Sequence, residues 1–108
     1  MTESGFSVRA NIRLLSTSES GRMLPIQNSY RPNHNFFGPD NREMAIGIIN
    51  FPPGVTLYPG ESIDMEMTFL PWERLDGEIW PGRQWRIQEA MWLVGIGTIL
   101  SVERPSKE

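Results

Sequence analysis

The chain has 108 residues, the size of one domain, with 39% hydrophobic residues and a net charge of −3. Cysteine is absent and histidine occurs once, which excludes disulfide bonds, zinc–thiolate centres and metal sites built from several imidazoles. Glycine and proline, at 10 and 9 residues, favour many short strands over a helical bundle.

The sequence offers no segment for a membrane or for export. No apolar run approaches the roughly 20 residues that cross a bilayer. Residues Met1–Gly5 have neither the positive start nor the apolar stretch of a signal peptide. We therefore expect a soluble cytoplasmic protein without membrane contact. Segment 1–5 is expected to be disordered, residues 6–102 to form one barrel domain, and residues 103–108 to be a C-terminal tail.

Three segments alternate between apolar and polar residues. From Phe6 to Leu14 every second side chain is apolar, and the same pattern recurs over residues 62–69. A shorter alternation over 84–88 places Trp85 on the apolar side. Because side chains on a strand point to opposite faces in turn, each segment predicts a strand with one face in a core. Trp85 is accordingly predicted to be a core residue.

The segments between these strands are less regular. Residues 16–32 carry polar and turn-forming residues and predict a long irregular connection. A Gly-Pro-Asp-Asn run at 38–41 predicts a turn, and residues 44–51 predict a largely apolar strand interrupted at Gly47. No helix is expected anywhere in the chain.

The last third of the chain contains a turn signal and a long apolar segment. Asp76-Gly77 is a dipeptide preferred in two-residue hairpin turns. Residues 92–102 are apolar on both faces, which is typical of a strand in the middle of a closed sheet. We interpret Gly95 and Gly97, inside that segment, as sites of close packing and not as a dinucleotide-binding motif.

Together these segments predict an all-β fold, a small six-stranded antiparallel Greek-key β-barrel. Closure would remove the strand edges that otherwise promote aggregation. A sandwich of two sheets is the alternative arrangement.

Catalytic motifs are missing from the sequence, which has neither a phosphate-binding glycine loop nor a Gly-x-Ser-x-Gly turn. His34 lies in a polar stretch and is expected to meet solvent in a loop or at a strand edge. Asp64 and Glu66 share one strand face and could approach each other as in a glycosidase, but a solvated face is favoured. We expect no catalytic residue, no enzymatic activity, no metal and no cofactor.

Arginine supplies nine of the ten basic residues. Its planar fork suits carboxylates, phosphates and aromatic faces, although the surplus can equally reflect genomic base composition. Arg22, Tyr30 and Arg31 lie on one long connection and form a candidate anion-binding or backbone-binding surface. The acidic net charge weakly disfavours a dedicated nucleic-acid-binding protein.

All four tryptophans lie in the last third of the chain. Trp72 and Trp80 flank an acidic, turn-forming segment and are candidates for exposed anchors at a protein interface, as is Trp92. The alternative is that Trp72 and Trp80 cap one end of the barrel.

Short motifs follow one another along nearly the whole chain. They are Ser20-Gly21-Arg22-Met23-Leu24-Pro25, Tyr30-Arg31-Pro32, 44–52, Pro59-Gly60-Glu61, Gly82, Ile87-Gln88-Glu89 and Val94-Gly95-Ile96-Gly97. In this order and spacing, from Phe6 to about Val102, they resemble the third, C-terminal domain of translation elongation factor Tu. The resemblance implies a six-stranded antiparallel barrel, in agreement with the strand pattern.

The resemblance also implies partners. In elongation factor Tu this domain packs on the GTPase domain, touches the nucleotide-exchange factor and binds the T stem of aminoacyl-tRNA. Carried over to this chain, the RNA-binding or partner-binding residues are Arg22, Tyr30, Arg31, Asn33 and Glu89. Three polar residues of the family, a histidine, a threonine and an arginine, are replaced here by Met23, Ile46 and Gln88, and a glycine of the family is replaced by Ala90.

From these features we expect a non-catalytic binding module that acts through protein–protein contacts, with the translation machinery as one source of partners. The replaced polar residues weaken RNA binding, and the chain has no GTPase domain, so it is not expected to bind GTP. Two alternatives stay open: a translation-associated domain that binds tRNA or rRNA, and an immunity-type or decoy-type mimic of elongation factor Tu.

Overall fold

A computed structural model of the chain describes residues 5–103 and has six strands. Their bounds are β1 Phe6–Leu14, β2 Asn33–Asn35, β3 Gly47–Asn50, β4 Ser62–Phe69, β5 Gln84–Glu89 and β6 Trp92–Glu103. They form one sheet in the order β2-β5-β6-β1-β4-β3, and every neighbouring pair is antiparallel. Residues 1–4 and 104–108, which hold most of the two predicted terminal segments, lie outside the described part of the chain.

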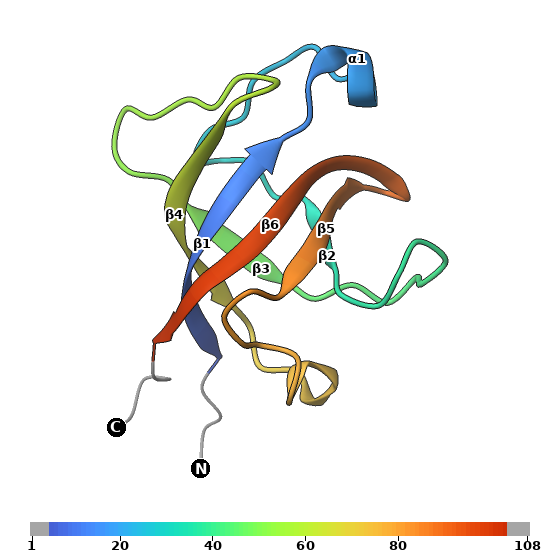
Figure 1. The fold of residues 1–108 in the computed structure, drawn as a ribbon, viewed down its shortest axis with the longest axis vertical. Coiled ribbons are helices and arrows are strands. Elements are labelled where there is room, and N and C mark those ends of the chain that lie inside the picture. The colour runs from blue at the N-terminus through green and yellow to red at the C-terminus, as the bar shows by residue number, and fades with distance from the viewer. Residues whose placement is uncertain (1–4, 104–108) are drawn as a thin grey trace.

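The sheet curls into a half-barrel, in which β6, β1 and β4 are three neighbouring strands between the two edges (Figure 1). Isolated antiparallel bridges join the two edges at the seam. His34 in β2 pairs with Ala45, just before β3, and Ile26 pairs with Leu57. The Ala45 N–H donates to the His34 carbonyl at 2.8 Å. The predicted fold class, a small all-β barrel of six antiparallel strands, is therefore confirmed.

Buried apolar residues fill the inside of this curl, as the alternation along β1 and β4 predicts. Its centre is aromatic: the rings of Phe36, Phe69 and Trp85 lie 5.4 Å apart, centroid to centroid, in each pairing. Trp85 is a core residue, as predicted. Gly97 provides the space for that indole, because a Cβ atom there would lie 2.3 Å from the ring. The close-packing interpretation of Gly97 is confirmed.

The two chain segments that enter and leave the barrel lie together. Ser7 at the start of β1 pairs with Glu103 at the end of β6. This pair lies at the opposite end of the barrel from the short helix α1, Thr17–Ser20 (Figure 1).

The expectation that the chain has no helix is wrong at two places. In α1 the Ser16 hydroxyl accepts from the Glu19 N–H while the Glu19 carboxylate accepts from the Ser16 N–H, which is a capping box. Residues Glu73–Leu75 form a 3₁₀ turn, η1, in place of the predicted hairpin around Asp76-Gly77. Leu75 is fully buried, and anchoring it in the core bends the segment away from strand pairing.

Two further predictions are corrected in the middle of the chain. Of the expected strand over 44–51, only β3 runs as a continuous strand, because Ala45 before it bridges across the seam to His34. His34 does not meet solvent: it lies in β2 and is fully buried. Its Nδ1 accepts from the Trp85 Nε1–H at 3.0 Å, and the ring packs edge-on against Phe69. The imidazole therefore completes the aromatic core.

Candidate functional site

Three of the predicted binding residues come together from two segments: Arg22 and Tyr30 from the connection between α1 and β2, and Glu89 from the end of β5. The Tyr30 hydroxyl donates to the Glu89 carboxylate at 2.5 Å, and the Arg22 guanidinium forms an ion pair with the same oxygen. The guanidinium carbon also lies 4.9 Å from the centroid of the Tyr30 ring. The fold thus brings these three residues into contact, while their role in binding stays a prediction.

This cluster is closed within the protein. The Arg22 Nε donates to the Leu24 carbonyl at 3.0 Å and Nη2 to the Pro25 carbonyl at 3.5 Å, so each arm of the guanidinium has a partner. Burial, together with the Glu89 carboxylate, raises the pKa of Tyr30, which stays a hydrogen-bond donor. The cluster therefore ties the loop after α1 to the end of β5 and leaves little of the Arg22 charge for a ligand.

The other two predicted residues, Asn33 and Arg31, have different partners and do not lie together. Asn33 donates to the Ala90 carbonyl at 3.4 Å and so joins the cluster from the side of the β5–β6 turn. Arg31 points away from it: its Nη1 donates to the carbonyls of Asn28 at 2.8 Å and Tyr30 at 3.1 Å. The predicted set is thus divided between two places on the surface.

The tryptophans also divide between the two ends of the barrel. Trp92 is 45% exposed and donates to the Ser20 carbonyl of α1 at 2.7 Å. Trp80 is about half exposed, whereas Trp72 is half-buried with its ring edge-on to Phe37. In Figure 1 the segment around η1 lies far from α1. Trp72 and Trp80 therefore do not share a surface with Trp92.

Exposed apolar side chains lie close in sequence to both members of the Arg22–Glu89 ion pair. Met23 and Leu24 are 77% and 68% exposed, and they follow Arg22 directly. Met91, in the β5–β6 turn, and Trp92, the first residue of β6, are also exposed. We call these four residues, Met23, Leu24, Met91 and Trp92, the apolar rim. Sequence reasoning missed three of them, although Met23 and Leu24 stand directly after Gly21-Arg22 in a polar connection, which was a signal of exposed apolar side chains.

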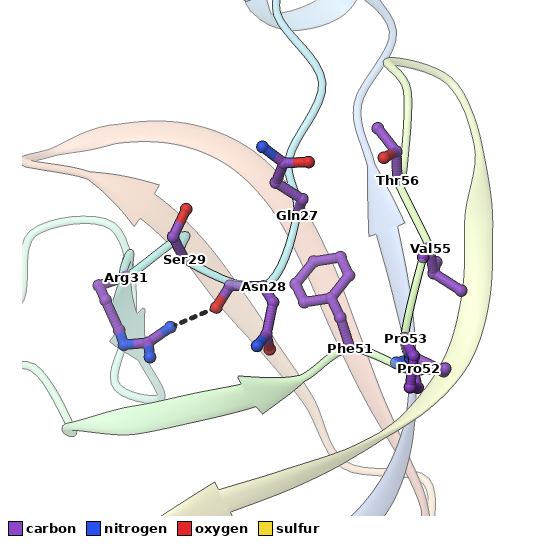
Figure 2. A pocket seen from close by; sticks show the side chains of 10 residues that line it. Gln27, Asn28, Ser29, Arg31, Phe51, Pro52, Pro53, Val55 and Thr56 are labelled. Atoms are coloured by element: carbon purple, nitrogen blue, oxygen red, sulfur yellow. Dashed lines mark hydrogen bonds between the residues drawn. The ribbon is translucent and has the colours of Figure 1, made fainter.

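A groove of about 860 Å³ opens between two segments at the barrel seam, residues 27–31 and 51–56 (Figure 2). Phe51 is buried and forms its floor, and in Figure 2 its ring is drawn between the two segments. We call this hollow the Phe51 groove. No sequence motif indicated it, because its two walls are some twenty positions apart in the chain.

A second hollow, of about 400 Å³, lies beside Trp72 at the other end of the barrel. Ile46 and Leu70 are exposed on its lining, and the Leu70 N–H donates to the Ile46 carbonyl at 2.9 Å. The charge at its rim is neutralised, because the Glu43 carboxylate is paired with Arg74.

Within residues 5–103, no three histidine or acidic side chains are grouped so that they could hold a metal ion. None of the helices in this part of the chain is long and apolar enough to cross a membrane. No model of a known protein family matches the sequence.

Proposed function

We propose that the chain is a cytoplasmic, non-catalytic binding module of the elongation factor Tu third-domain type, which acts through protein–protein contacts at the α1 end. The observation that carries this proposal is the apolar rim around a neutralised ion pair. Met23 and Leu24 are the most exposed large apolar side chains of the described residues. Methionine and tryptophan are both enriched in the buried centres of protein interfaces.

The contacts beneath the rim favour such a role. Two links, Arg22 to Glu89 and Trp92 to the Ser20 carbonyl, tie the loop after α1 to the β5–β6 turn. Holding the rim in place before binding lowers the entropy lost when a partner docks. A pair whose charges already neutralise each other is also less costly to cover than a free cation.

RNA binding is the second candidate function. Four arginines have no carboxylate partner among residues 5–103, and they could contact phosphates: Arg9, Arg31, Arg42 and Arg86. Arg22, which the resemblance makes the leading RNA contact, has its donors occupied within the protein. An affinity that depends on many phosphate contacts needs free cations, so a protein partner is the better-supported choice.

The test is affinity capture with chemical cross-linking, using wild type and a Met23→Ser/Leu24→Ser double variant. Both side chains are exposed, so the variant should fold. The matched control is Leu100→Ser/Val102→Ser, which removes exposed apolar side chains from β6. We expect a protein cross-link at the rim that survives nuclease treatment and the control but is lost in the rim variant.

Two results would contradict the proposal. One is a set of captured proteins that does not depend on the rim. The other is capture that disappears on nuclease treatment and weakens steeply with salt, which would instead support RNA binding.

A further inference from the structure

We infer that the Phe51 groove is a second contact site for the protein partner, and that it binds an extended acidic segment with one carboxylate on Arg31. The inference rests on the proposed function and adds to it the chemistry of the partner. The groove is separate from the apolar rim, so the two sites can be tested independently.

Each wall of the groove contains a hydrogen-bonded turn. On one side the Tyr30 N–H donates to the Gln27 carbonyl at 2.9 Å, which closes a turn. On the other side the Val55 N–H donates to the Pro52 carbonyl at 3.2 Å, with Gly54 at φ +77°. The two consecutive prolines of this second turn have fixed φ angles. A preformed site spends less of its binding energy on ordering its own walls.

The lining suits a peptide in an extended conformation. Phe51, Pro52 and Val55 offer apolar surface for a side chain of the bound segment. Gln27 and Asn28 are exposed on the facing wall and supply amide groups for its backbone. The volume is within the range of sites that enclose small ligands. Extended peptides are recognised through hydrogen bonds to their main chain together with pockets for their side chains.

The charge of the groove selects an acidic segment. Arg31 is its one charged lining residue, so no acidic side chain lines it. Arg31 is exposed and has no carboxylate partner within residues 5–103. Because its Nη1 is held by the Asn28 and Tyr30 carbonyls, the guanidinium is fixed in orientation while Nε and Nη2 make no hydrogen bond to the described residues. Two free donors on one planar fork match a carboxylate.

A nucleic acid fits this groove less well than a peptide. Affinity for RNA is built from many phosphate contacts, and here one cation stands beside a phenylalanine and two prolines. The single fork instead provides one specific pairing within a mostly uncharged site.

The test begins with selection of a phage-displayed library of linear 12-residue peptides on the full chain, followed by fluorescence polarisation with the enriched peptides. We expect enriched peptides to share an Asp or Glu beside an apolar residue. Changing that acid to its amide, or Arg31→Gln in the protein, should weaken binding about tenfold or more. Arg86→Gln, which removes another arginine without a carboxylate partner, should leave binding unchanged.

Arg31→Gln also removes the hydrogen bond to the Asn28 carbonyl, so a second variant tests the groove with Arg31 left in place. Ser29→Glu adds a carboxylate on an exposed lining residue and should likewise weaken binding about tenfold, with an amide spectrum that shows the fold intact. In ¹⁵N spectra the peptide should shift the amides of Ser29, Arg31 and Val55.

Failure of this inference is distinguishable from failure of the proposed function. It is overturned if no peptide is enriched, if the acid is dispensable, or if tRNA displaces the peptide from Arg31. If the shifted amides are those of Met23 and Leu24, the groove assignment is wrong while the apolar rim stands. Protein capture that depends on the apolar rim but not on Arg31 would likewise show that the groove assignment is wrong while the apolar rim stands.

Discussion

The buried imidazole of His34 makes the free energy of unfolding depend on pH. Burial lowers the pKa of His34 to about 4, and the nearby Gly47 backbone, which acts in the opposite direction, does not compensate. Its Nδ1 is occupied by the Trp85 N–H, and Nε2 has no hydrogen-bond partner of ordinary geometry in the described structure. The buried ring therefore favours its neutral form.

The sign and size of the effect follow from linkage. A free histidine has a pKa of about 6.5, so the unfolded chain takes up the proton first as the pH falls. The contribution of His34 is complete above pH 6.5 or so and is lost progressively down to the folded-state pKa of about 4. The difference of about 2.5 between the two pKa values corresponds to about 3–4 kcal/mol, at about 1.4 kcal/mol per pKa unit.

Urea unfolding followed by tryptophan fluorescence at several pH values between 7.5 and 4.5 measures this loss. Carboxylates also titrate toward the acid end, so the comparison that isolates the imidazole is with His34→Gln, which keeps a hydrogen-bond acceptor but has no titrating group. We expect the variant to be less stable at pH 7.5 and to show a much flatter pH dependence. An equal slope in both proteins would refute the assignment of the effect to His34.

Three further changes test the packing and the cluster. Ala90 has a positive φ of 54°, which is strained for a residue with a Cβ atom. Ala90→Gly should therefore raise the free energy of unfolding by about 0.5–1 kcal/mol, and a variant that unfolds at a lower temperature would contradict this strain. Gly97→Ala should cost about 3 kcal/mol, because the new methyl would overlap the Trp85 ring; unchanged stability in urea would show that the ring can move away. Glu89→Gln should lower the free energy of unfolding by about 1–3 kcal/mol, because it leaves the half-buried Arg22 without a neutralising partner. Glu43→Gln, which removes the acid of an exposed ion pair, should lower it by about 0.5 kcal/mol. Equal costs for these last two in chemical denaturation would mean that burial does not strengthen the first pair.

The strands that could be predicted are those whose two faces differ. In β1 and β4 the side chains alternate between core and solvent, so the pattern and the structure follow from the same geometry. β2 could not be found in this way, because its residues Asn33, His34 and Asn35 are all polar. The last two are buried only because distant groups satisfy them: Asn35 donates to the Gln88 side chain at 2.8 Å, and His34 accepts from Trp85.

The candidate sites divide in a similar way. The motif order singled out Arg22, Tyr30 and Glu89 as binding residues, and in the fold they lie together. That their charges neutralise each other depends on side-chain distances, which a motif does not encode. The Phe51 groove could not be predicted, since it arises where the barrel seam separates between the Ile26–Leu57 and His34–Ala45 bridges.

The pairing of Ser7 with Glu103 has a practical consequence for attaching other molecules to this protein. A dye, a resin or a host domain joined through either of these strand ends would be directed away from α1, leaving the surface around Met23 and Leu24 accessible (Figure 1). The same adjacency allows a short peptide to join the two strand ends, with a new opening made in an exposed turn such as the one at Gly38. The barrel is thus suited to insertion into a loop of a larger assembly.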